Sequence, residues 1–241
     1  MKIAIISDLH ANYLASKAMF ETLEGKVDVI YCLGDIIGYY PDPLKTIDLV
    51  RDNCKETIIG NHDAIAVVDN YEEEAFFLNE NAGNAIIWSR EILDENLEYF
   101  KFLSNLHYKL KVEHDGYKLL LAHGTPVYMS EWEYIFYYGE PEIECMFDEW
   151  LDLYTADIIA LGHTHIPYRY FSKEDPVKAV LNPGSVGQSR NSDPRAYCGI
   201  IDTEEHTISH LRVHYDIEAV IKRVIEEKFP KELGERLKHG E

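Results

Sequence analysis

The sequence predicts an α/β fold, and two observations carry that prediction. First, short and continuously apolar runs at residues 3–6 and 29–33 have the length and composition of strands buried on both faces. Second, each run is followed by helical periodicity, at residues 14–19 and 44–54. Each apolar run also ends within two residues of a carboxylate, Asp8 or Asp35. In sheets built this way, ligand sites lie just outside the carboxyl ends of the strands.

The same pattern continues along the chain. Residues 57–59 form a third short apolar run before Asn61, which completes a β-α-β-α-β progression. Residues 118–122 and 157–161 lead into His123 and His163. Four further runs, at 168–171, 177–181, 197–201 and 208–213, follow without intervening helices and are predicted to form an antiparallel meander.

The C-terminal region contains one further predicted element. Apolar residues at 217, 220, 221, 224 and 225 match the i, i+3, i+4, i+7 spacing of an amphipathic helix. The tail from residue 231 is polar and is expected to fray. Because no repeat, low-complexity segment or linker interrupts the chain, residues 1–241 are predicted to form a single domain.

The charge and cysteine content of the chain limit the kinds of binding partner and the cellular compartment that we expect. With 43 acidic against 23 basic residues, the formal net charge is −20, which opposes binding to a nucleic-acid polymer but not to a small phosphorylated molecule. No apolar stretch approaches the roughly 20 residues of a membrane helix. The four cysteines form no C-x-x-C pair and are expected to be reduced thiols. A cytoplasmic protein without a membrane partner is the simplest interpretation.

Five short motifs carry the chemistry: Asp8-Leu9-His10, Gly34-Asp35, Gly60-Asn61-His62-Asp63, His123-Gly124 and Gly162-His163-Thr164-His165. They supply carboxylate, amide and imidazole donors but no thiolate, a set that suits Mn²⁺, Fe, Zn²⁺ or Ni²⁺. Each motif alone is compatible with ordinary turn or cap chemistry. Together they offer more donors than one structural site needs, which favours two divalent ions that share a carboxylate. The predicted metal ligands are Asp8, His10, Asp35, Asn61, His123, His163 and His165.

The order of these motifs resembles that of the calcineurin-like metallophosphoesterase superfamily over essentially the whole chain. The resemblance implies a four-layer αββα sandwich of two mixed β-sheets flanked by helices. It also implies that Asp35 bridges the two ions. The first ion would be held by Asp8, His10, Asp35 and His165, and the second by Asp35, Asn61, His123 and His163.

The resemblance further assigns roles in catalysis. His62 would handle the proton of the leaving group, with Asp63 as its orienting partner, while a hydroxide bridging the metals attacks phosphorus. Protein phosphatase activity is disfavoured, because that branch has an arginine after the Gly-Asp motif and Glu in place of Asp63. The pattern Gly38-Tyr39 followed by Pro41-Asp42-Pro43 resembles instead the small phosphodiesterases and diadenosine-tetraphosphatase-like proteins of the superfamily. We therefore expect hydrolysis of a small phosphodiester, nucleotide or phosphoanhydride; the alternatives are a phosphomonoesterase or a non-catalytic binding scaffold.

Residues 182–188 form a second candidate region, with Asn182 and Gly184 as predicted substrate contacts. Glycines after a strand allow backbone N–H groups to approach a ligand closely. The competing interpretation is a tight turn that supports the His163 and His165 loop. Arg190 and Arg195 are predicted to help bind a phosphate from this side, against the alternative of ordinary surface arginines.

An aromatic and acidic segment at residues 126–150 is the candidate cap. Residues 128–138 carry aromatic side chains on several faces next to a metal ligand, and Tyr134 and Tyr137 are predicted to stack on a base or other planar group. The alternative is a dimer interface, where aromatic residues are also enriched, which would make the protein a homo-oligomer.

Overall fold

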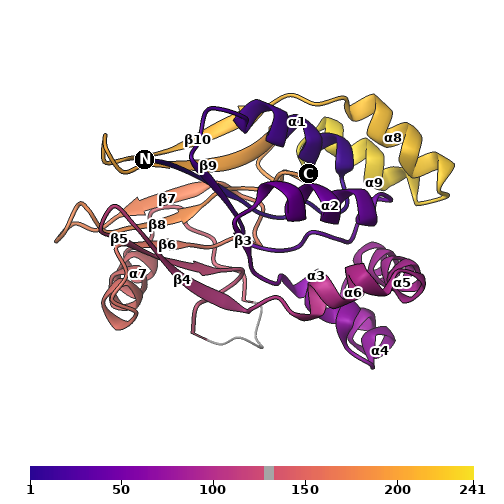
Figure 1. Ribbon diagram of the computed structural model, residues 1–241, viewed down its shortest axis with the longest axis horizontal. Coiled ribbons are helices and arrows are strands. Elements are labelled where there is room, and N and C mark those ends of the chain that lie inside the picture. Colours follow the sequence, from indigo (N-terminus) through magenta and orange to yellow (C-terminus); the bar gives the residue numbers. More distant parts are fainter. Residues whose placement is uncertain (128–132) are drawn as a thin grey trace.

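Two five-stranded sheets face each other between layers of helices (Figure 1). The structure is a computed structural model that describes residues 1–127 and 133–241. The first sheet has the order β10-β9-β1-β2-β3, and the second has the order β4-β5-β6-β8-β7. Both are mixed, since β1 pairs with β2 in parallel and with β9 antiparallel, while β5 pairs with β6 in parallel and with β4 antiparallel. The predicted four-layer sandwich is confirmed.

Eight of the ten strands in the described residues coincide with predicted apolar runs to within about two residues, whereas β3 shares only Thr57 with its run and β4 was not predicted. The first sheet contains β1 (Lys2–Ile6), β2 (Val29–Cys32), β3 (Glu56–Thr57), β9 (Ala196–Asp202) and β10 (Thr207–Val213). The second contains β4 (Lys109–His114), β5 (Tyr117–Ala122), β6 (Ile158–Ala160), β7 (Tyr168–Phe171) and β8 (Ala179–Asn182).

Strand β1 shows why its apolar run is continuous. Ile3 and Ile5 point into the core between the two sheets. Ala4 and Ile6 point the other way, into a core shared with α1 (Tyr13–Leu23) and α2 (Pro43–Asn53). Because successive strand residues face opposite sides, burial on both sides requires an apolar residue at every position. On the outer face of the second sheet, α7 (Pro141–Leu153) closes a further core.

A group of helices fills the chain between β3 and β4. It comprises α3 (Asn61–Val67), α4 (Tyr71–Phe76), α5 (Glu80–Glu95) and α6 (Leu97–Ser104). These helices lie together at the lower right of Figure 1. Their buried side chains join the core of α1 and α2. Helix α3 begins at Asn61 itself, so two predicted site residues, Asn61 and His62, are fixed on its first turn.

The predicted antiparallel meander is wrong. Strands β7 and β8 form a hairpin in the second sheet, whereas β9 and β10 form a hairpin in the first. The connection between β8 and β9 crosses from one sheet to the other, so β8 pairs with β6 and β9 pairs with β1. An apolar run predicts burial but does not identify the neighbouring strand, and for this reason the four runs were compatible with one sheet.

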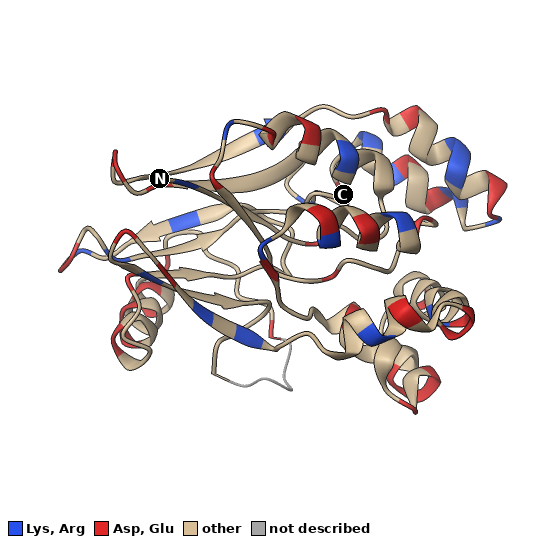
Figure 2. Cartoon of the chain, in the orientation of Figure 1, with Lys and Arg blue, Asp and Glu red and all other residues tan. Residues whose placement is uncertain are grey.

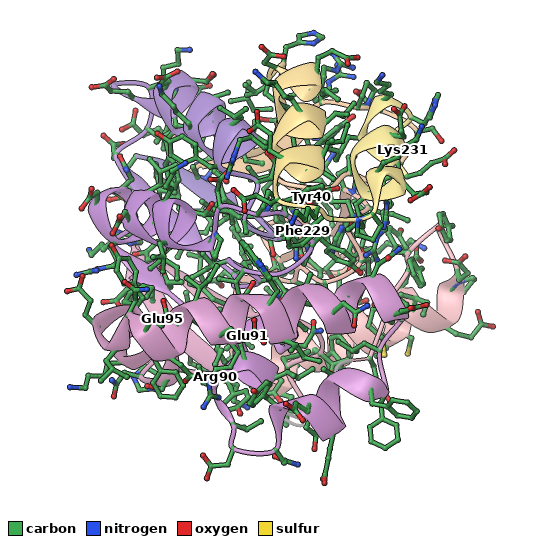
Figure 3. All side chains as sticks on the ribbon, turned by 90° about the vertical axis from the view of Figure 1, so that its right-hand side faces the viewer. Tyr40, Arg90, Glu91, Glu95, Phe229 and Lys231 are labelled. Atoms are coloured by element: carbon green, nitrogen blue, oxygen red, sulfur yellow. The ribbon has the colours of Figure 1, made fainter. Side chains whose placement is uncertain are left out.

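The C-terminal tail is ordered, which corrects the expectation that it frays. Helix α8 (Ile217–Glu226) is confirmed, and α9 (Lys231–Glu235) and a 3₁₀ turn at Arg236–Lys238 follow it. Leu233 and Leu237 are buried in one core with Tyr40, whose hydroxyl donates a hydrogen bond of 3.1 Å to the carbonyl of Leu233. Figure 3 shows Tyr40 between α8 and α9 and the helix α5. Two leucines four residues apart thus bring this otherwise polar segment into the core.

Charge is distributed unevenly over the surface. Figure 2 shows acidic residues on the outer helices, among them α4, with three glutamates in its first turn, and α7. Among the residues that the structure describes, no helix has the length and apolar character needed to span a bilayer.

Candidate metal centre

The predicted donors meet where the carboxyl ends of strands from both sheets converge. Asp8 follows β1 and Asp35 follows β2, both in the first sheet, whereas His123 follows β5 and His163 follows β6 in the second. The seven predicted ligands are all buried, among them the carboxylates of Asp8 and Asp35. A charge buried in this way is costly unless a partner of opposite charge compensates it.

Three groups of donors have their ligand atoms within 4.8 Å of one another. They are Asp8 with His10 and His165, His10 with Asp35 and His62, and Asp35 with His123 and His163. Asp35 therefore belongs to two groups, and so does His10. The shortest carboxylate–imidazole distances are 3.3 Å from Asp35 Oδ2 to His123 Nε2 and 3.4 Å from Asp8 Oδ1 to His165 Nε2.

Backbone carbonyls set the tautomer of three of these histidines. Nδ1 of His10 lies 3.3 Å from the carbonyl of Ile37, that of His123 lies 2.8 Å from Leu33, and that of His165 lies 2.6 Å from Gln188. Because a carbonyl oxygen only accepts, each Nδ1 must donate, which leaves Nε2 to face the centre. This arrangement is common for metal-binding histidines, whose second nitrogen is oriented by a backbone or carboxylate partner.

Buried polar atoms without hydrogen-bond partners indicate that the centre is built for a cation. Among the described residues, Asp8 Oδ1 and Asn61 Oδ1 are buried and have no hydrogen-bond partner. The Nε2 atoms of His10 and His165 lie 3.0 Å apart. Since burial lowers the pKa of both rings well below its usual value, these are two neutral nitrogens whose lone pairs face each other. A first-row ion at about 2.1 Å from each would satisfy both, so the residues present fit a divalent metal.

The carboxylates differ in how the surroundings act on them. Burial opposes the ionisation of Asp35, but the adjacent His123 and His62 outweigh it and hold the pKa of Asp35 below its usual value. For Asp8, burial prevails over the attraction of His123 and raises the pKa to about 6. For His123, burial would lower the pKa, yet the Asp35 carboxylate raises it to about 9. The site thus compensates its buried charge only in part, and a bound cation would keep both carboxylates ionised.

The backbone around the donors is strained. Asp8, His10, Asp35, His163 and His165 all have positive φ, between 50° and 68°. Residues other than glycine rarely adopt this region, and when they do the position is often functional. Gly60 allows the Asp35 loop to approach, since a Cβ there would lie 2.1 Å from Asp35 Oδ1.

The structure places His62 and Asp63 differently from the predicted pair. The ring of His62 lies beside the donors, with Nε2 3.9 Å from Asp35 Oδ2, but its Nδ1 has no hydrogen-bond partner among the described residues. The carboxylate of Asp63 instead accepts hydrogen bonds of 3.0–3.2 Å from the backbone N–H groups of Ile36, Ile37 and Gly60. The expectation that Asp63 orients His62 is therefore wrong. Asp63 ties the loops that carry Asp35 and Asn61 to each other.

The two predicted substrate contacts in the loop after β8 are structural. The amide of Asn182 donates to the carbonyl of Gly162 at 2.7 Å and to Thr164 Oγ1 at 3.1 Å, and its Oδ1 accepts from the N–H of Gly184. Gly184, at φ 77°, faces Tyr197 and Pro167, with no room for a Cβ. This corrects the substrate-binding prediction for both residues: they brace the loop of His163 and His165, as the competing interpretation held.

Arg190 lies at the centre, as predicted, although what it binds there remains a prediction. Its guanidinium donates to the Tyr39 hydroxyl and to Gln188 Oε1, both at 3.2 Å. Its positive charge contributes to the lowered pKa values of His10, His62 and His165, for each of which burial is the larger cause. Tyr39, which the sequence analysis missed, packs against His10 and His62 with ring centroids at 4.8 and 5.0 Å. The position of Tyr39, four residues after Asp35 and directly after Gly38, is a signal in the sequence that could have identified it.

Of the two tyrosines predicted to contact substrate in the candidate cap, one lies at the metal centre and the other lies in the core. Tyr134 stacks on His163, with ring centroids 4.0 Å apart and an angle of 26°. Tyr137 turns away from the donors, packs against Phe147, Tyr168 and Tyr170, and donates to Glu144. The predicted substrate contact at Tyr137 is therefore wrong, because its ring belongs to the core under α7. Tyr128 and Trp132, also in the predicted cap, lie outside the described residues.

Comparisons with known proteins agree with this geometry. Residues 1–206 match the model of the calcineurin-like phosphoesterase superfamily domain. The chain is 33% identical to an uncharacterized protein from Methanocaldococcus jannaschii over 98% of this chain and 96% of that protein. It is 30% identical to a metallophosphoesterase from Sphaerobacter thermophilus, whose crystal structure superposes with a TM-score of 0.80 over 100% of this chain and 99% of the other.

A hypothetical protein from Pyrococcus horikoshii shares the fold at 20% identity, with a TM-score of 0.84 over 100% of this chain and 98% of the other. The family match and the carboxylate–imidazole cluster together support divalent metal binding and a metal-dependent phosphoesterase. This chain belongs to the calcineurin-like phosphoesterase superfamily.

Proposed function

We propose that the protein is a phosphodiesterase that uses two divalent ions, with Mn²⁺ as the first candidate, to hydrolyse a small phosphodiester, nucleotide or phosphoanhydride. The observation that carries the proposal is the sharing of Asp35 between two donor groups. One carboxylate between two groups is what a two-ion site requires. Asp8, His10, Asp35 and His165 would hold one ion, and Asp35, Asn61, His123 and His163 the other. Bound divalent ions would lower the pKa of water and neutralise charge on the phosphoryl oxygens.

Arg190 would bind the phosphoryl group. In the part of the chain that the structure describes, no carboxylate pairs with its guanidinium, in contrast to Arg195 and Arg223, which pair with Asp193 and Asp42. Its hydrogen-bond acceptors, Tyr39 and Gln188, are neutral. The positive charge of Arg190 is therefore available to an anion.

His62 would hold and transfer the proton of the leaving group. Its ring reaches the edge of the donor cluster, and burial keeps its pKa low in the absence of ligand. Its Nδ1 is not committed to a backbone carbonyl, unlike Nδ1 of His10, His123 and His165. A ring nitrogen without a fixed hydrogen-bond partner allows the histidine to gain and lose a proton. A metal-binding histidine, by contrast, must keep one tautomer.

The net charge of −20 favours a small substrate over a nucleic-acid polymer. The free cysteines, Cys32, Cys54, Cys145 and Cys198, support a reducing compartment, and we propose the cytoplasm.

A panel assay with Mn²⁺ tests the proposal. The substrates are bis-p-nitrophenyl phosphate, p-nitrophenyl phosphate, cyclic nucleotides and diadenosine tetraphosphate, compared by kcat/KM, with chelator-treated protein as the control. Higher kcat/KM on a diester or anhydride than on the monoester supports the phosphodiesterase. Preference for the monoester would identify a phosphomonoesterase instead. Stoichiometric metal without hydrolysis of any substrate would favour the binding scaffold.

A further inference from the structure

Three aromatic rings form an exposed ladder beside the metal centre. Tyr134, Phe136 and Tyr138 alternate along the chain and are 51%, 42% and 71% exposed. The rings of Tyr134 and Phe136 are parallel within 4° with centroids 5.8 Å apart. Those of Phe136 and Tyr138 are parallel within 8° at 6.5 Å. The ladder differs from the stacked pair of Phe147 and Tyr168, which is buried in the core under α7, because its rings are exposed to solvent.

The residues between these rings anchor the ladder. Ile135 and Tyr137 pack against the core that α7 and the second sheet enclose. The hydroxyl of Tyr137 donates to Glu144 Oε1 at 3.0 Å, and the N–H of Tyr138 donates to Glu140 Oε2 at 2.7 Å. The inward-facing residues thus pack into the core, whereas the three alternating rings are turned outward and remain 42–71% exposed.

The ladder begins on a residue of the metal centre. Tyr134 lies over His163 at 4.0 Å between ring centroids, and its hydroxyl interacts with Arg190. From that point the rings lead along the chain to the more exposed Tyr138. A ligand whose phosphoryl group reached both His163 and Arg190 would therefore carry its remaining atoms alongside this row of aromatic rings.

We propose that Tyr134, Phe136 and Tyr138 form the subsite for the nucleobase of the substrate, so that the preferred substrate is a nucleoside phosphodiester. This inference rests on the proposed function. Aromatic side chains that stack on bases tolerate different bases, because each base presents a flat π face. The acidic neighbours Glu133 and Glu140 are compatible with an uncharged base but oppose the approach of a polynucleotide. The occupant we expect is thus a single nucleoside unit.

The test compares two diesters with the same leaving group. They are the p-nitrophenyl ester of thymidine 5′-monophosphate and methyl p-nitrophenyl phosphate, which differ only in the group that the nitrophenol leaves behind. The nucleoside preference is kcat/KM for the thymidine ester divided by kcat/KM for the methyl ester. Because both esters carry the nitrophenyl ring, a contribution of that ring common to both cancels in this ratio. The variant is Phe136→Ala with Tyr138→Ala, which leaves Tyr134 and the metal donors intact.

Phe171→Ala is the matched control. Phe171 is a comparably exposed aromatic residue, but it pairs with Ala179 at the start of β8. It therefore lies at the end of the second sheet opposite to His123 and His163, which follow the carboxyl ends of the parallel strands. Its substitution should leave the nucleoside preference unchanged.

We expect the double variant to lose the nucleoside preference by about tenfold or more, with hydrolysis of the methyl ester within about twofold of the parent. A parent protein that hydrolyses both esters equally well, or a variant that keeps the preference, would overturn the subsite while leaving the phosphoesterase in place. A kept preference together with a loss of oligomer in light scattering would assign the ladder to a dimer interface instead. Hydrolysis of neither ester by the parent would overturn the proposed function, and the subsite with it.

Discussion

The Oδ1 atom of Asp35 accepts a hydrogen bond of 2.8 Å from the backbone N–H of His62. This contact fixes the carboxylate so that its other oxygen, Oδ2, faces the imidazoles of His10 and His123, at 3.8 and 3.3 Å. It also joins the loop after β2 to the first turn of α3. The orientation of the carboxylate shared by two donor groups thus depends on the backbone of the residue proposed to transfer protons.

Asp35 should be needed for the binding of both ions. Because it belongs to both proposed ligand sets, Asp35→Ala should abolish hydrolysis and lower the metal content of the protein. His10→Ala should lose activity yet retain metal at the group of Asp35, His123 and His163. Elemental analysis of the purified variants measures both outcomes. Retention of two ions by Asp35→Ala would refute the bridging role.

His62→Ala should keep its metal content and lose about 10²–10⁴ in kcat on substrates with poor leaving groups. Nitrophenyl esters should suffer less, because nitrophenolate departs without a proton. The comparison requires kcat on both substrate types and metal content by elemental analysis. Equal losses on the two types would contradict the acid role, and loss of metal would make His62 a ligand.

Replacing Arg190 should weaken the binding of substrate and leave the metals in place. Arg190→Met should lower kcat/KM by about tenfold or more, since a hydrogen bond to a charged group is worth about 1.5–3 kcal/mol. Arg195→Met is the control, because Arg195 already pairs with Asp193 at the surface and should leave kcat/KM unchanged. Equal values of kcat/KM for the two variants would contradict a role of Arg190 in substrate binding.

The sequence placed the donors correctly near one another because they follow the ends of apolar strands. Asp8 stands two residues after β1 and Asp35 three residues after β2, and that position at the ends of two neighbouring parallel strands brings them to one edge of the sheet. The meeting of His123 and His163 with these carboxylates depends on how the two sheets pack, and local patterns in the sequence do not encode it.

Other roles depend on contacts that no local pattern shows. Asn182 and Tyr137 are residue types that often contact ligands. Here the amide of Asn182 is instead hydrogen-bonded to the carbonyl of Gly162, and the ring of Tyr137 packs against Phe147 of α7. From the sequence, Asp63 was expected to orient its neighbour His62. Its carboxylate instead accepts hydrogen bonds from backbone N–H groups of the loop after β2, which is distant in the sequence. A side chain's role in a folded protein is set by whichever partner reaches it, and that partner is often far away in the sequence.

Asp63 should therefore matter for stability rather than for proton transfer. Asp63→Ala would leave the N–H groups of Ile36, Ile37 and Gly60 without their acceptor in a buried site. An unsatisfied buried donor costs about 1–3 kcal/mol, so we expect a clear fall in the midpoint of urea unfolding, measured with chelator present to remove any effect of metal. An unchanged midpoint combined with the kinetic defect predicted for His62→Ala would restore the orienting role to Asp63.

The C-terminal segment should contribute to the stability of the whole protein. Leu237 is buried against the core that contains Tyr39 and Tyr40, while the guanidinium of Arg236 lies 5.4 Å from the ring centroid of Tyr39. Leu237→Ala should lower the free energy of unfolding by about 2–5 kcal/mol, the range for a large-to-small change in a core. Leu153→Ala, at a residue 68% exposed at the end of α7, should change it by no more than about 0.5 kcal/mol. Urea unfolding followed by circular dichroism compares the two variants. If both variants lose similarly little free energy of unfolding, the tail frays in solution. Its contacts with Tyr39 and Tyr40 could then not stabilise the loop after β2, in which Tyr39 packs against His10 and His62.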